Sequence, residues 1–257
     1  MEEGKEQVAE KKIKRFLLIV NCLILALGTS GGPLIMRLYF IHGGQRVWLS
    51  AFLETAGFPL MLIPLAISYI KHRHHLHHHP PPSTTISITP EKLNIISMKP
   101  PIFFAAAFIG ILNGIDDYLF AYGIARLPVS TSSLIIASQL GFTAFFAFLL
   151  VKQKFTAFTV NAIVLLTIGA GVLAMHTSSD RSAGVSAKQY AISFSTTVAA
   201  SALYGFVLPS VELVYKKIKQ PITYSLVMEF QFVMCMFATL FCAIGMIANN
   251  DFKVRLR

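Results

Sequence analysis

The chain has 257 residues, of which 54% are hydrophobic and only 13% are charged, and its mean hydropathy is +0.63. Soluble domains carry about 25% charged residues, so this composition excludes an ordinary soluble protein and indicates an integral membrane protein. The formal net charge of +10 lies mostly in short segments between apolar runs, where Lys and Arg set membrane orientation. We therefore expect no nucleic-acid partner.

Apolar segments of spanning length follow one another along the chain, since a membrane helix needs about 20 apolar residues. We identify seven such segments, at residues 16–36, 47–70, 101–125, 127–151, 155–177, 189–211 and 222–248. None alternates in the way that a transmembrane strand does. The sequence therefore predicts an all-α, polytopic helical membrane protein embedded in the lipid bilayer.

Polar segments frame the predicted spans. Residues 1–15 form a basic N-terminus, and residues 71–99 form a His- and Pro-rich loop. Such a His tract can bind metal, but no Cys or carboxylate is interleaved in it. We interpret the loop as solvated and expect no metal site and no cofactor. The short link at Arg126-Leu127-Pro128 predicts that the third and fourth spans are antiparallel neighbours.

The distribution of Lys and Arg predicts the orientation of the chain. Basic residues are concentrated in the N-terminus, in the loop 71–99 and in the connections 152–154 and 216–219, whereas the opposite connections carry fewer. Cytoplasmic segments of membrane proteins carry this excess. We therefore expect the N-terminus to be cytoplasmic.

Helix-breaking residues occur in the first two spans. Gly31-Gly32-Pro33 predicts an interruption near the outer end of the first span, and Gly57-Phe58-Pro59 predicts a bend in the second. Broken helices recur at transporter sites, although small residues also allow neighbouring helices to pack closely. Both interpretations remain open.

Carboxylates inside the spans are the main functional signal. An acidic side chain at the bilayer centre costs roughly 2.5–3.5 kcal/mol, so the acids found there commonly lie on substrate or proton paths. The candidates for proton coupling are Glu54, Asp117 and Glu229. An interhelical hydrogen bond or ion pair is the structural alternative for Glu54.

Two other acids are predicted to be structural. Asp116 points about 100° away from its neighbour around the helix, and we expect it to pair with a cation such as Arg126 or Arg37. Glu212 is placed to pair with Lys216 at i+4. The chain contains no Gly-rich phosphate loop, no His-Glu-x-x-His and no Gly-x-Ser-x-Gly. We expect that it is not an enzyme.

Several motifs occur in order along the chain and resemble the plant purine permease family of the drug/metabolite transporter superfamily. They are Asn21 with GTSGGP at 28–33, TAGFP at 55–59, LNGIDDYLFAYG at 112–123, AYGIARLPVSTSSLI at 121–135 and LYGF at 203–206. The resemblance runs from about residue 16 to residue 253. It implies a plasma-membrane permease that moves adenine, other purine bases and adenine-type cytokinins by proton symport.

The resemblance also implies a domain organisation. Members of this superfamily consist of two inverted repeats of five helices, ten spans in all, with the substrate at the repeat interface. Residues 16–178 then correspond to the first repeat, residues 189–250 to the first two helices of the second, and residues 251–257 to a short basic tail. The alternative expectation is a truncated, non-transporting isoform that acts by association with a full-length permease chain.

A planar purine needs hydrogen bonds at its edge and a stacking face. If the resemblance holds, Asn21, Asn113 and Gln139 supply the hydrogen bonds, and Tyr204 supplies the face from the second repeat. These four residues are the predicted substrate site.

The predicted orientation is tested by cysteine labelling from outside intact cells. We expect Ser83→Cys, in the basic loop, to stay unlabelled, because that loop is cytoplasmic. Ser182→Cys lies between the fifth and sixth predicted spans, and we expect it to react. Labelling of position 83 from outside would refute the orientation.

Overall fold

The computed structural model describes residues 2–67, 70, 98–176, 186–218 and 222–251. The chain divides into two compact units, Met1–Gln45 and Arg46–Arg257. Every regular element in the described residues is helical, which confirms the predicted all-α, polytopic membrane fold. The His- and Pro-rich tract at 71–97 and the tail at 252–257 lie outside the described residues.

The first unit consists of one long helix, α1 (Glu2–Ile41), whose apolar part is Arg15–Ile41. The helix continues through Pro33, so the predicted interruption at Gly31-Gly32-Pro33 is wrong. Proline removes only the one hydrogen bond that its own nitrogen would have donated to the carbonyl four residues earlier. Transmembrane helices tolerate this loss, and here the helix stays unbroken.

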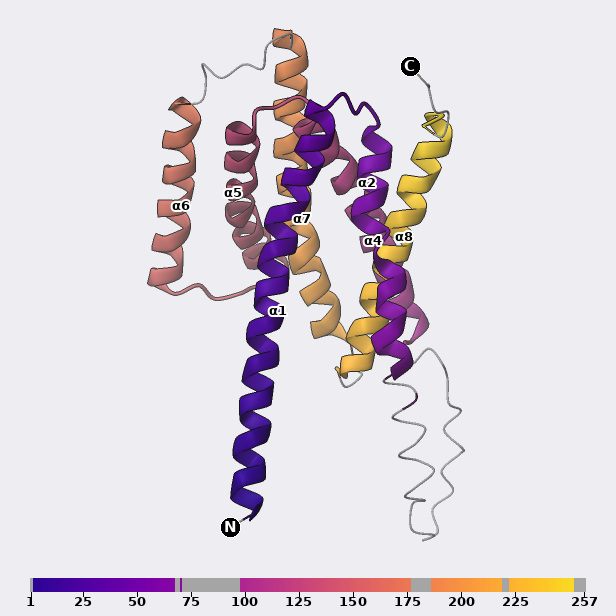
Figure 1. Cartoon of the computed structure of the whole chain (residues 1–257). Helices are drawn as coiled ribbons and strands as arrows, with labels where there is room; N and C mark the ends of the chain where they lie inside the picture. The colour runs from indigo at the N-terminus through magenta and orange to yellow at the C-terminus, as the bar shows by residue number, and fades with distance from the viewer. Residues whose placement is uncertain (1, 68–69, 71–97, 177–185, 219–221, 252–257) are drawn as a thin grey trace. The chain divides into compact units, whose positions relative to one another are not determined.

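The second unit contains the remaining helices (Figure 1). They are α2 (Val47–Thr55), the 3₁₀ turn η1 (Phe58–Met61), α4 (Pro100–Ile124), α5 (Val129–Phe146), the π-helical turn η2 (Ala147–Val151), α6 (Ala157–His176), α7 (Ala187–Lys217) and α8 (Tyr224–Ala248). The change from α2 to η1 confirms the bend predicted at Gly57-Phe58-Pro59.

Length and hydropathy identify six of the described helical segments as able to cross a membrane. They comprise the apolar part of α1, the segment Val47–Ile67 that contains α2, then α4, the segment Ser130–Val151 that contains most of α5, and finally α7 and α8. The fifth predicted span corresponds to α6, whose apolar stretch Ala157–Gly169 is shorter. The chain is therefore a multi-pass integral membrane protein.

Local sequence signals explain where several helices begin. A capping box starts α7, because the Ser186 hydroxyl accepts a hydrogen bond from the Gln189 backbone nitrogen at 3.3 Å and the Gln189 side chain accepts one from the Ser186 nitrogen at 3.5 Å. Thr223 caps α8 by accepting a hydrogen bond from the Leu226 nitrogen at 3.3 Å. Prolines stand in the first turn of α4, where no helical hydrogen-bond donor is lost.

Helix α4 lies at the centre of the second unit and packs against α2, α7 and α8 (Figure 1). On its other side α7 packs against α5, and α5 packs against α6. The prediction that the third and fourth spans are direct neighbours is therefore wrong, because α4 and α5 make few contacts while α7 packs against both. The short connection holds only the ends of the two helices together.

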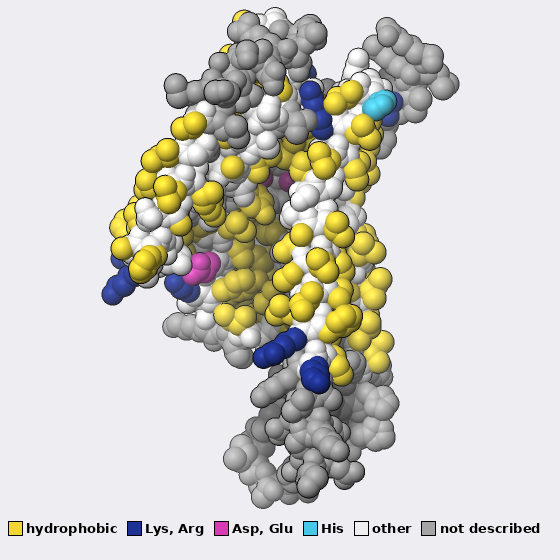
Figure 2. All heavy atoms as spheres, turned by 60° about the vertical axis from the view of Figure 1, so that its left-hand side comes forward, with side chains coloured by type: hydrophobic (Ala, Val, Ile, Leu, Met, Phe, Trp, Pro, Cys, Tyr) yellow, Lys and Arg dark blue, Asp and Glu magenta, His cyan; other side chains and the backbone are white. Residues whose placement is uncertain are grey.

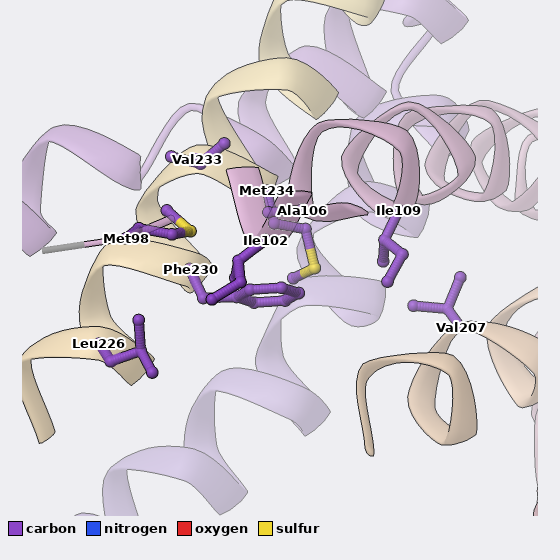
Figure 3. Packing of buried hydrophobic residues seen from close by; sticks show 9 residues of the cluster. All are labelled: Met98, Ile102, Ala106, Ile109, Val207, Leu226, Phe230, Val233 and Met234. Atoms are coloured by element: carbon purple, nitrogen blue, oxygen red, sulfur yellow. The ribbon is translucent and has the colours of Figure 1, made fainter. Parts of the chain in front are cut away.

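The core of this unit is apolar and joins α4, α7 and α8. Its buried members are Met98, Ile102, Ala106, Ile109, Val207, Leu226, Phe230, Val233 and Met234. Figure 3 shows Phe230 of α8 lying against Ile102 of α4, and Ile109 facing Val207 of α7. Large hydrophobic side chains such as Phe104 and Phe158 are also exposed, and hydrophobic atoms cover much of the face in Figure 2. Lipid would solvate this surface.

Glycines let the helices of the second unit approach closely. A Cβ at Gly110 would collide with the backbone carbonyl of Met234, and one at Gly114 would lie 3.0 Å from the carbonyl of Ala238. These two glycines, four residues apart, form the surface of α4 on which α8 packs. Close approach of this kind is how membrane helices gain packing energy, since lipid tails give no hydrophobic drive for association.

A matched pair of glycine variants tests this packing. We expect Gly110→Ala to lower the melting temperature in detergent, because the added methyl group meets a backbone atom and overpacking costs about 1–3 kcal/mol. Gly169→Ala in α6 adds the same methyl group where no atom lies within 4 Å. It should be neutral or stabilising, because Ala favours a helix over Gly by about 1 kcal/mol. Equal melting temperatures for the two variants would contradict the close contact of α4 with α8.

Candidate functional site

Three carboxyl groups come together where α2 packs against α4, and we call Glu54, Asp116 and Asp117 the carboxylate cluster. Glu54 lies in the last turn of α2 and interacts electrostatically with both aspartates of α4. Asp116 is 5% exposed and Asp117 is 9% exposed, whereas Glu54 is exposed. Two predicted candidates, Glu54 and Asp117, thus share one site.

The two aspartates differ in their hydrogen bonds. The side-chain nitrogen of Asn113 donates to Oδ2 of Asp117 at 3.0 Å, one helical turn away, so these two residues share a face of α4. Oδ1 of Asp116 is buried and has no hydrogen-bond partner in the described structure. The sequence predicts a structural role for Asp116 and gives no sign that it is buried beside Asp117 without a cation from the described second unit.

Arg126, one of the two cations predicted to pair with Asp116, follows the end of α4 and lies against Tyr122. The Arg126 guanidinium stands 4.0 Å above the centre of the Tyr122 ring, and its Nη1 donates to the Tyr122 carbonyl at 3.3 Å. Ten residues separate Arg126 from Asp116, or about 15 Å of helix rise. Arg37, the other predicted partner, belongs to the first unit.

Helix α8 closes the site by polar contacts with both neighbours. The Thr239 hydroxyl lies 3.0 Å from the Thr55 carbonyl of α2 and can donate to it. The Cys242 thiol lies 3.8 Å from the Gly114 carbonyl of α4. Both contacts sit within one turn of a cluster residue along the chain, so they help to fix α2 and α4 where their carboxyl groups meet.

Tyr204 and Gln139 lie along the contact of α7 with α5. The Ser201 hydroxyl donates to the Ile135 carbonyl at 3.1 Å, and Gly205 lies so close to α5 that a Cβ there would stand 2.7 Å from Cβ of Phe142. Tyr204 falls between these contacts on α7, and Gln139 falls between them on α5. Both side chains are half-buried.

Tyr204 also lies near the carboxylate cluster, because it interacts electrostatically with all three acids. Predicted residues from α2, α4 and α7 are therefore brought together, and Gln139 lies at the level of Tyr204. This arrangement joins helices from both of the predicted repeats.

An aromatic stack beside the cluster was missed by the sequence analysis. Trp48 of α2 stacks on Tyr118 of α4 with ring centroids 3.9 Å apart and planes at 22°. Phe241 of α8 stands 6.0 Å from Trp48, and the indole lies against Gly245, where a Cβ would collide with it. The sequence gives only a weak indication of this stack. Trp48 is the only tryptophan, and Tyr118 directly follows the two aspartates.

The remaining predicted site residues are Asn21 and Glu229. Asn21 lies in α1 of the first unit. Glu229 is 5% exposed and accepts a hydrogen bond from the Ser225 hydroxyl at 3.4 Å. It precedes Thr239, the α8 residue that contacts α2 beside the cluster, by ten residues, or about 15 Å along α8.

The expectation for Glu212 is confirmed. Its carboxylate lies 3.3 Å from the Lys216 ammonium, and both side chains are about half exposed. This pair is a local surface contact of α7 with no link to the cluster.

The site is built mainly from hydrogen-bond acceptors. The carboxylate cluster offers its oxygens, while the Asn113 amide and the Tyr204 hydroxyl add both donors and acceptors. Such a set suits a proton or a ligand rich in N–H groups, and the neighbouring aromatic rings suit a planar ligand.

A family model and several proteins of Arabidopsis thaliana match this chain. A family model described as purine nucleobase transmembrane transport matches residues 16–256. The chain is 53% identical to Purine permease 3 of Arabidopsis thaliana over 237 residues, which cover 92% of this chain and 64% of that protein. It is 52% identical to Purine permease 2 of the same plant over 244 residues, with 95% and 65% covered.

Relatives of lower identity also match most of this chain and only part of their own length. Probable purine permease 4 of Arabidopsis thaliana is 36% identical over 214 residues, covering 83% of this chain and 51% of that protein. The chain thus spans a little under two thirds of the length of Purine permeases 2 and 3. The family model matches almost the whole chain, which shows that the chain belongs to the purine permease family.

Proposed function

We propose that this chain takes part in moving purine nucleobases such as adenine, and adenine-type cytokinins, across the plasma membrane by proton symport. The observation that carries the proposal is the carboxylate cluster, which lies inside a chain whose family model describes purine nucleobase transport. Buried acids in membrane helices commonly serve substrate or ion paths. The cytoplasmic N-terminus remains the orientation expected from the basic residues.

In this proposal the substrate binds between α4, α5 and α7. Tyr204 offers its ring as a stacking face, and Gln139 and Asn113 hydrogen-bond to the edge of the purine. Support comes from the half-buried positions of all three side chains and from the electrostatic link between Tyr204 and the cluster. Asn21 of α1 is the fourth proposed contact.

Proton coupling is assigned to the carboxylate cluster. Glu54 and one aspartate of α4 are the proposed carriers, and the sequence analysis named Asp117 for the second role. Several acids this close together cannot all stay charged at low cost, so binding a proton there stabilises the site. Glu229 is the third proposed carrier and would act at a separate position on α8.

A chimera provides the full length that these experiments need. In it, this chain replaces the matching 237-residue region of Purine permease 3. We expect Gln139→Ala and Tyr204→Ala to raise the KM for labelled adenine by roughly 5- to 150-fold, because losing a partner of a buried polar edge costs about 1–3 kcal/mol. The measurement is initial uptake in cells that lack a purine permease, normalised to surface protein.

Matched controls are Gln153→Ala and Tyr224→Ala, which remove the same groups from exposed positions. Unchanged KM in both site variants would place the substrate elsewhere. The 257-residue chain expressed alone tests the expectation of a non-transporting isoform, and robust adenine uptake by it would contradict that expectation.

Proton coupling predicts a second result in the same chimera. Acid outside the cell should stimulate adenine uptake, and Glu54→Gln should weaken the stimulation because the amide cannot exchange a proton. Glu212→Gln, at the exposed pair with Lys216, should keep the full pH response. An identical pH response in the Glu54 variant and the parent would remove Glu54 from the coupling mechanism.

A further inference from the structure

We propose that Asp116, and not Asp117, is the α4 carboxyl that takes up and releases the transported proton. Asp117, which Asn113 holds in one orientation, instead serves as a fixed hydrogen-bond acceptor for the N–H edge of the substrate. This assignment rests on the proposed proton-coupled transport and divides its roles between two adjacent residues.

The local contact of Asp117 favours its charged form. The Asn113 amide donates to Oδ2 at 3.0 Å, and a hydrogen bond donated to a carboxylate stabilises the ionised state. Asn113 also holds that oxygen in one orientation on the helix. A carboxylate stabilised and oriented in this way is suited to accept hydrogen bonds from a ligand.

Asp116 is in the opposite situation. It is 5% exposed, and its Oδ1 has no hydrogen-bond partner in the described structure. An ionised oxygen that is buried without a donor is costly, whereas a protonated carboxyl avoids that cost. A bound proton therefore stabilises the buried Asp116 carboxyl, whereas at Asp117 a hydrogen bond from Asn113 stabilises the carboxyl group.

In the described part of the second unit, the groups that interact electrostatically with Asp116 carry no positive charge. Helix α2 brings Glu54, α7 brings Tyr204, and the next residue of α4 is the acid Asp117. Just after the end of α4, Arg126 lies over the Tyr122 ring. The electrostatic neighbour that acts on Asp116 is Glu54, and its negative charge opposes a second charge nearby.

The proposed step is a simple acid–base exchange. A proton from the acidic side bonds to a carboxylate oxygen of Asp116, and the same O–H bond breaks when the proton leaves towards the cytoplasm. Glu54 of α2 interacts electrostatically with Asp116, so it is the second ionisable group on the proposed proton path. No other group changes its covalent state.

The experiment compares Asp116→Asn with Asp117→Asn in the chimera described above, with Glu212→Gln as the exposed control. Two transport modes are measured at equal surface amounts. Net adenine uptake under an inward proton gradient requires proton release, whereas exchange of labelled for unlabelled adenine requires only substrate binding and movement. A pH-sensitive dye in proteoliposomes records the accompanying proton flux.

We expect Asp116→Asn to lose acid-stimulated uptake and adenine-coupled proton flux while keeping exchange. Asp117→Asn should keep the acid stimulation and show a raised KM in both modes. Asp116→Glu retains an ionisable group and should restore acid stimulation with a shifted pH midpoint. Glu212→Gln should match the parent in every measurement.

Other outcomes overturn the assignment. Retained acid stimulation in Asp116→Asn, or loss of its exchange at a normal surface amount, would show that Asp116 is not the proton carrier. If Asp116→Asn fails to reach the surface, Asp116→Glu decides, and an unshifted midpoint refutes the inference. A parent chimera that transports adenine without acid stimulation would instead disprove proton coupling, and one without adenine uptake would disprove the proposed function itself.

Discussion

Charge inside a hydrocarbon layer has to be enclosed by protein, because lipid offers no hydrogen bonds and no counter-charge. Helix α4 carries two adjacent aspartates and is the helix around which the second unit is arranged. Helices α2, α7 and α8 pack directly against it, and each contributes a polar or ionisable group near the acids. The arrangement of the second unit follows largely from this enclosure.

The helices can pack closely around the acids because glycines lie where the helices meet. Gly110 and Gly114 let α8 approach α4, and Gly205 lets α5 approach α7. Polar contacts then fix the approach, as when Thr239 reaches the Thr55 carbonyl and Ser201 reaches the Ile135 carbonyl. The acids of the carboxylate cluster are thus held in place by helix packing and by neutral hydrogen bonds between the helices.

The sequence predicted the helices well because their signals are local. Apolar length located the spans, and Gly57-Phe58-Pro59 marked the bend that separates α2 from η1. Pro33 misled the analysis, since a proline costs a membrane helix one hydrogen bond without necessarily breaking it. The contact of α4 with α7 was not predictable from the short link to α5, because link length fixes only which helix ends are adjacent.

The sequence predicted those parts of the site that depend on residues close together along one helix. Asn113 and Asp117 are four residues apart on one helix, and the structure joins them by a hydrogen bond of the kind that this spacing allows. Whether Asp116 meets a cation depends on residues distant in sequence, which spacing along one helix cannot reveal. The stack of Trp48 on Tyr118 likewise depends on α2, α4 and α8 together.

That stack gives the chain an internal optical reporter. Trp48 is the only indole in the sequence, and it rests on Tyr118, directly after the α4 aspartates, while its own helix carries Glu54. Any rotation or sliding of α2 along α4 that alters access to the acids would also part the two rings and change the surroundings of the indole. Intrinsic fluorescence of this one residue would then follow the motion in real time, without an attached dye.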